Sequence, residues 1–142
     1  MAGFSKSLAQ AIFDATLASS RSSLSAKPGV YMSLHTAAPD DVSGGNEATY
    51  AGYTRVDIAS KMASSIVGTA PEQTVRGTNN ADINFPASTG ATQTVTHWAI
   101  WSDASLGTTA YIMYSGALSS SRQVQSGDVV VIPAAQLIID LT

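Results

Sequence analysis

Apolar residues at the start of the chain recur with the spacing of one helix face. Phe4, Leu8 and Ile12 lie four residues apart, and further apolar residues fill the neighbouring positions. The serine-rich run 19–23 and Pro28 end this pattern, because serine competes for backbone hydrogen bonds and proline cannot continue a helix. The pattern predicts an N-terminal helix with a broad apolar face, which either packs on its own domain or docks on a neighbouring subunit.

After Gly29 the apolar period changes to two, which is typical of half-buried strands. Two long polar stretches, 37–51 and 68–80, read as loops that vary with the partner. Strands are expected at 30–35, 53–60, 82–85, 94–101, 109–117, 129–132 and 137–141, with 62–67 as an extension of the second or its hairpin partner.

Short strands joined by compact turns indicate a mainly β fold, an antiparallel β-sandwich or jelly roll with one N-terminal α-helix. Residues 1–142 are expected to form a single domain, with helix and linker in 1–28 and the β-sandwich in 29–142. Trp98 and Trp101 are three apart in a strand and should face opposite sides. The predicted core consists of Val95, Trp98 or Trp101, Ile100, Ile112, Val129, Val131, Leu137 and Ile139.

Composition narrows the possible functions. Only 12% of residues are charged, the net charge is −3, and there is no cysteine, so a disulfide framework and a cysteine nucleophile are excluded. Lysine and arginine are scattered singly, which argues against nucleic acid as a partner. No run of about 18 apolar residues could span a membrane, and Gln10 and Asp14 interrupt the one stretch that resembles a secretory signal. We expect a soluble protein made in a cytoplasm.

Few residues suggest catalysis or metal binding. His35 and His97 could ligate a metal with a carboxylate, but packing against backbone or hydroxyl groups is the expectation for His97. The loop from Asp40 to Glu47 matches no calcium-loop spacing and is expected to be a solvated turn. No hydrolase or phosphate-loop motif is present, so we expect no enzyme, no cofactor and no metal. The five tyrosines could line a sugar-binding face: Tyr31, Tyr50, Tyr53, Tyr111 and Tyr114.

Several short segments, in this order, resemble a family of small bacteriophage virion proteins. They are VYMSLHTAAP at 30–39, GGNE at 44–47, GYTR at 52–55, INFPA at 83–87, VTHWAIW at 95–101, GAL at 116–118, SGD at 126–128 and IPA at 132–134. The resemblance runs from about residue 6 to the end of the sequence. The chain departs from the family in a less glycine-rich spacer at 48–51 and in Trp101.

The resemblance implies a structural role in the phage particle, made in the host cytoplasm and without catalytic residues. We expect a capsid decoration (cement) protein that binds the major capsid protein and itself. The alternative is a tail or tail-fibre component that touches a host glycan, and a small phage enzyme is the third and weakest hypothesis. Residues expected to contact a partner are Phe4, Leu8, Ile12, Pro39, Asp40, Tyr50, Tyr53 and Trp101.

Overall fold

The structure is a computed structural model of the 142-residue chain. The residues it describes are 3–4, 8–10, 12–13, 29–40, 44–105 and 111–141.

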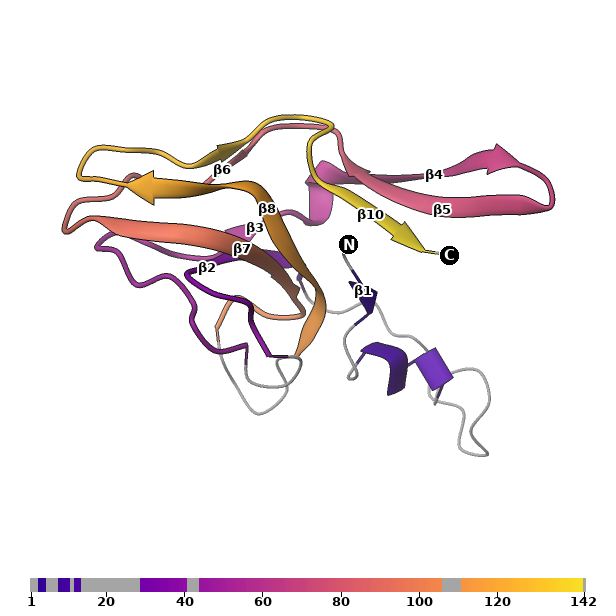
Figure 1. Ribbon diagram of the computed structural model, residues 1–142, viewed down its shortest axis with the longest axis horizontal. Helices are drawn as coiled ribbons and strands as arrows, with labels where there is room; N and C mark the ends of the chain where they lie inside the picture. Colours follow the sequence, from indigo (N-terminus) through magenta and orange to yellow (C-terminus); the bar gives the residue numbers. More distant parts are fainter. Residues whose placement is uncertain are drawn as a thin grey trace.

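The described strands form three antiparallel sheets (Figure 1). Sheet A has five strands in the order β1 (Gly3–Phe4), β8 (Ile112–Val124), β7 (Gln93–Trp101), β2 (Tyr31–His35) and β3 (Val56–Asp57). Sheet B has β10 (Ile138–Leu141), β5 (Glu72–Asn79) and β4 (Met62–Thr69), and sheet C pairs β6 (Ile83–Asn84) with β9 (Val131–Ile132). A short 3-10 helix, η1 (Ala59–Lys61), leads into β4.

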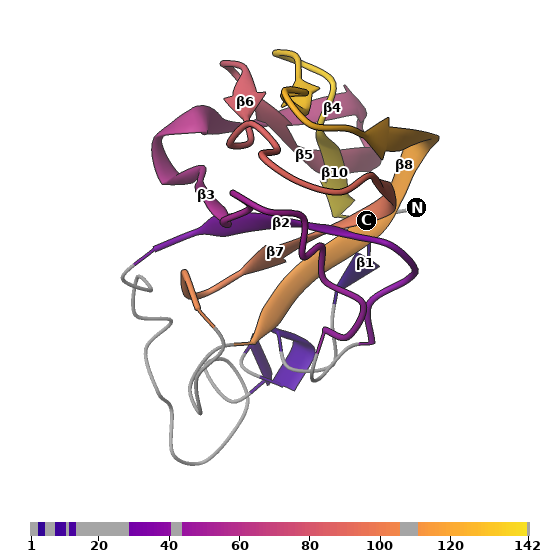
Figure 2. The same cartoon turned by 90° about the vertical axis from the view of Figure 1, so that its left-hand side faces the viewer.

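The sheets are stacked in two layers, with sheet A below and sheets B and C above (Figure 2). Apolar side chains from both layers meet between them and form the main core. Sheet A contributes Met32, Leu34, Val95, Ile100 and Val124, and the upper layer with its connections contributes Ile83, Phe85, Val130, Leu137 and Ile139. The mainly β, sandwich-like fold expected from the alternating pattern is confirmed.

The two tryptophans lie on opposite faces of β7, as their spacing predicts. Trp98 packs in the main core, whereas Trp101 joins Ala99 and Ile112 in a second, smaller cluster. Both rings are buried. Sheet A therefore packs against apolar groups on each of its faces.

The prediction of a polar loop at 68–80 is wrong, because most of this stretch is the strand β5. It pairs with β4 along the whole length of both strands, from Met62 opposite Asn79 to Thr69 opposite Glu72. This hairpin extends away from the rest of the molecule (Figure 1), so much of it is exposed. A strand exposed on both faces shows no alternation of apolar and polar residues, and the pattern that predicts strands is absent.

Two further expectations are corrected within the strands. The strand expected at 53–60 shortens to β3, because the 3-10 helix η1 begins at Ala59. Val129 and Val131 are 44% and 36% exposed instead of buried, while Val130 faces the core. Four consecutive apolar residues carry no information about which alternate pair points inward, so the sequence could not decide between them.

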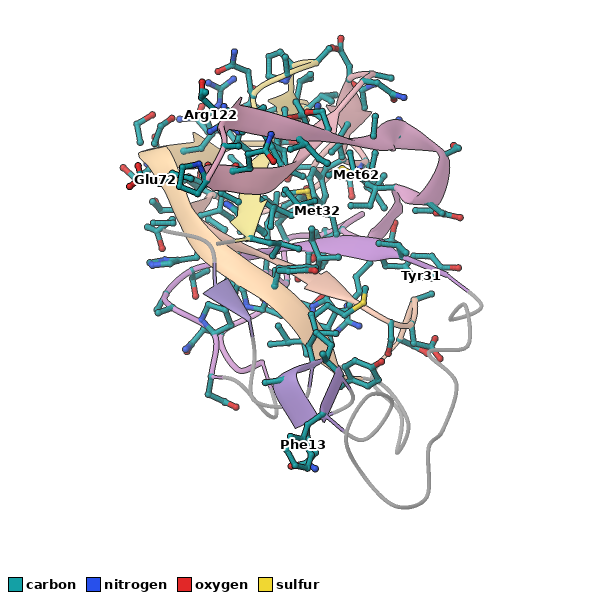
Figure 3. The ribbon with its side chains drawn as sticks, turned by 90° about the vertical axis from the view of Figure 1, so that its right-hand side faces the viewer. Phe13, Tyr31, Met32, Met62, Glu72 and Arg122 are labelled. Atoms are coloured by element: carbon teal, nitrogen blue, oxygen red, sulfur yellow. The ribbon has the colours of Figure 1, made fainter. Side chains whose placement is uncertain are left out.

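The N-terminal segment differs from the single helix predicted by its spacing. Phe4 belongs to β1, which pairs antiparallel with the outer edge of β8, opposite Tyr114. Helix is described at residues 8–10 and 12–13, and the remainder of the predicted helix lies outside the described residues. Leu8 is buried, whereas Phe13 is exposed at the bottom of the molecule in the view of Figure 3. Leu8 packs on its own chain, and docking of the segment on a neighbouring subunit stays a prediction.

Candidate functional site

A buried hydrogen-bond chain links β2, β7 and the loop after β2. Ser33 and His35 are two residues apart and therefore lie on one face of β2, beside Trp101 of the neighbouring strand. The Trp101 indole donates to Ser33 Oγ at 2.7 Å, and Ser33 Oγ lies 2.7 Å from His35 Nε2. His35 Nδ1 lies 2.8 Å from the Gly45 carbonyl oxygen. Since a carbonyl only accepts, Nδ1 carries the proton and Nε2 accepts from the serine hydroxyl.

A serine hydroxyl bonded to an imidazole is the geometry of an activated nucleophile. Here both Ser33 and His35 are completely buried, and a backbone carbonyl, not a carboxylate, orients the ring. Burial lowers the pKa of His35 below its ordinary value and keeps the ring neutral. The hydrogen bonds of this pair tie the two strands and the loop together.

A largely buried ion pair between Glu47 and Arg55 adjoins this chain. Arg55 Nε and Nη2 bind the two carboxylate oxygens at 2.9 and 2.7 Å, and the guanidinium carbon lies 3.9 Å from the Trp101 ring centroid. Tyr53 donates to Glu47 Oε1 at 3.0 Å. Burial opposes ionisation of Glu47, but the hydrogen bonds from Arg55 and Tyr53 outweigh it and hold the pKa of this carboxyl below its usual value.

Three of the eight residues expected to contact a partner are buried, and only Asp40 is fully exposed among those whose side chains are described. Tyr50 and Trp101 are buried, and Tyr53 is half-buried with its ring stacked on Phe85. These three aromatic side chains thus offer little or no surface for the expected contact. Of the others, Leu8 is buried, Ile12 and Pro39 are half-buried and Asp40 is exposed, while the side chain of Phe4 is not described.

The candidate metal ligands do not come together. Among the described residues, no group of three or more His, Cys, Asp or Glu side chains could hold a metal ion. His35 and His97 do lie opposite each other on β2 and β7. His97 Nδ1 lies 2.8 Å from the Thr96 hydroxyl, which agrees with the packed role expected for it. Glu47 was expected in a solvated turn, but its carboxylate instead forms an ion pair with Arg55.

The free edge of β4 is a candidate contact surface that the sequence reasoning missed. Among the described strands, β4 is the outermost strand of sheet B, and its eight residues contain neither a charged residue nor a proline. Ile66 in this strand is 68% exposed, and Val75 directly opposite it on β5 is also exposed. Natural proteins usually protect an exposed edge with lysine, proline or a bulge, because its unpaired backbone groups can pair with another chain. The absence of charged residues from 62–69 is the feature of the sequence that could have predicted this edge.

Comparison with known proteins identifies one matching family. A family model described as "Podophage GP4 fiber I protein gp80" matches residues 3–140. No curated protein matches the chain. In the described part of the chain, no helix has the length and apolar character needed to cross a membrane. The resemblance to small phage virion proteins is confirmed, and the chain is a structural component of the phage particle.

Proposed function

Since the chain belongs to the family of the podophage GP4 fiber I protein gp80, we propose that it is a subunit of a fibre on the phage tail. The observation that carries this proposal is the extent of the match, which covers residues 3–140. The tail-fibre alternative therefore has better support than the capsid decoration role that we expected first. The family description names a fibre protein, and nothing in it points to the capsid shell.

We further propose that the subunit acts by binding and not by catalysis. The one arrangement with a catalytic geometry among the described residues, Ser33 with His35, is completely buried. Its hydrogen bonds, together with the Glu47–Arg55 pair, hold the first loop against sheet A. A rigid body of this kind suits a subunit that must hold its shape within an assembly.

The proposed assembly contact is the free edge of β4, and its proposed occupant is the same edge of a second copy of this chain. Two identical antiparallel edges offer complementary rows of backbone donors and acceptors. The absence of charge along β4 removes like-charge repulsion between copies, and Ala63, Ser64 and Ser65 are small enough to permit close approach. Pairing would also cover Ile66, which the isolated chain leaves exposed.

Labelling of intact virions tests the fibre assignment. Fab fragments raised against the purified chain are added to virions, and the complexes are imaged by cryo-electron microscopy. The proposal predicts Fab density on fibres at the tail. Fab density distributed over the capsid shell would overturn it and restore the decoration hypothesis.

A further inference from the structure

A groove of about 600 Å³ lies between the second half of β8 and the segment 130–138, which carries β9 and the start of β10. Figure 1 shows β8 running beneath this yellow segment. Trp98 from β7 also lines the groove, next to Gly116 on β8. The groove is separate from the Glu47–Arg55 network and from the free edge of β4, and none of the roles assigned above uses it.

Trp98 reaches the groove because its neighbour is a glycine. The two residues are paired across β7 and β8. A Cβ added to Gly116 would lie 2.8 Å from the indole Cζ2 and 3.3 Å from Nε1. The ring therefore lies directly against the bare backbone of Gly116, a position that any larger residue would obstruct.

The indole N–H of Trp98 is uncommitted, unlike that of Trp101, which donates to Ser33. Trp98 makes no side-chain hydrogen bond in the described structure, although only 6% of the residue is exposed. No buried side-chain nitrogen or oxygen among the described residues lacks a partner, so the Trp98 N–H must reach accessible space. The groove is accessible space that Trp98 lines.

Other uncommitted polar side chains line the same groove. Arg122 is the charged residue that lines the groove, and it lies at the surface (Figure 3). It forms no ion pair within the described residues. The side chains of Gln136, Ser119 and Ser120 likewise form no hydrogen bond with the described part of the chain. Tryptophan, arginine, glutamine and serine side chains thus all offer hydrogen-bond donors to the same groove. A site that recognises hydrogen-bond acceptors requires such donors.

The charge and the walls of the groove restrict what it can bind. No aspartate or glutamate lines it, although the whole chain carries a net charge of −3. Leu118, Val130, Ile132 and Leu137 supply apolar wall. A ligand that satisfies all of this has apolar faces, several hydroxyl acceptors and a negative charge. A sugar ring bearing a carboxylate combines these three properties.

We propose that this groove binds an acidic saccharide, with the carboxylate on Arg122 and a ring hydroxyl accepting from the Trp98 indole. The inference rests on the proposed fibre function, because a fibre brings such a groove to the surface of the host. Gln136 and the two serines contact further hydroxyls, and the apolar walls cover the faces of the rings.

Two-dimensional ¹H–¹⁵N NMR tests the inference directly, because the chain has two tryptophans and hence two indole N–H signals. Trp98→Phe identifies which signal belongs to Trp98. Short oligogalacturonates, their methyl esters and neutral cello-oligosaccharides are titrated into the wild-type protein. The acidic sugar should shift the Trp98 signal saturably and leave that of Trp101 in place, and the uncharged sugars should bind at least several-fold more weakly.

Matched variants show whether Arg122 is responsible. Arg122→Gln should weaken oligogalacturonate binding roughly tenfold, which is the scale of a hydrogen bond to a charged group. Arg76→Gln removes the same charge from sheet B, outside the groove, and should leave the affinity unchanged. An unmoved Trp98 signal, equal affinity for acid and ester, or equal loss in the two variants would each overturn the inference.

These outcomes are independent of the fibre assignment. Fab density on fibres together with an unmoved Trp98 signal would remove the saccharide site and leave the proposed function intact. Fab density on the capsid shell, with selective binding of the acidic sugar, would remove the fibre function and leave the site without the host-surface role.

Discussion

Two ion pairs of nearly identical geometry lie in contrasting parts of the molecule. Glu47–Arg55 in the body and Arg76–Asp140 on sheet B are both bidentate, with nitrogen–oxygen distances from 2.7 to 2.9 Å. Their burial differs. The Arg55 and Glu47 side chains are 4% and 21% exposed, whereas those of Arg76 and Asp140 are 38% and 35% exposed.

The comparison teaches that burial, more than contact geometry, decides what an ion pair does. Removing one partner from a buried pair leaves an uncompensated charge in a poorly solvated place, whereas water replaces the partner of an exposed one. In the body of the protein, polar side chains such as Glu47 and Arg55 therefore bind one another in the interior and stabilise the fold. Sheet B leaves its surface available for other contacts, and the free edge of β4 belongs to this second region.

Breaking the buried pair should give the largest effect on stability. Glu47→Ala leaves the Arg55 guanidinium with the Asp103 carbonyl but without a carboxylate, and it removes the acceptor of the Tyr53 hydroxyl. We expect a loss of about 3–5 kcal/mol in the free energy of unfolding, measured by urea denaturation. Asp140→Ala is the matched change in the exposed pair and should cause a much smaller shift of the urea midpoint. Equal shifts in the two variants would refute the comparison.

Truncation within the core should have the next largest effect. Ile100 lies between the two layers, and Ile100→Ala should cost roughly 2–5 kcal/mol because it leaves a cavity. Val129→Ala removes apolar atoms from an exposed position and should change the free energy of unfolding by less than about 0.5 kcal/mol. A large loss in the valine variant would mean that Val129, and not Val130, faces the core.

Acid should weaken the buried network by a smaller, graded amount. The pKa of Glu47 lies below its ordinary 4.5 and that of His35 below its ordinary 6.5, so the unfolded chain takes up both protons before the folded one does. The free energy of unfolding should then fall as the pH drops below 6.5, and fall further below 4.5. Urea denaturation across this range measures it, and a free energy that stays level or rises would contradict the proposed protonation states.

A charge on the free edge should affect assembly with the smallest change in stability. Ile66→Lys replaces an exposed apolar side chain on β4 and should change the free energy of unfolding by less than about 0.5 kcal/mol. It should nevertheless weaken self-association, measured by light scattering after size-exclusion chromatography, because lysine protects edges from pairing. Val129→Lys adds the same charge at another exposed site and should not. Equal association of both variants and the wild type would exclude the β4 edge as the contact.

The sequence predicted the fold best where strands have one buried face. The alternation at 30–35 and 94–101 located β2 and β7, and the spacing of Trp98 and Trp101 correctly placed them on opposite faces. It failed at β5, where neither face is consistently buried, and at 129–132, where consecutive apolar residues hide the direction of alternate side chains. Local patterns report burial, and these two stretches give no clear burial signal.

The candidate sites depended on contacts that no local pattern contains. Glu47 was expected in a loop and Arg55 in a strand, and only folding pairs them and brings Arg55 over Trp101. Trp98 and Arg122 line one groove from different strands, and the segment that closes it comes later in the chain. A single sequence shows that such residues are present but not that they meet at one site.

A cryo-electron microscopy map of the virion fibre, at a resolution that traces individual strands, tests the central claim most directly. The account predicts this chain within the tail fibre, with a strand from a second copy paired along β4 and covering Ile66. A map with the chain on the capsid shell, or with β4 facing solvent inside the fibre, would contradict it.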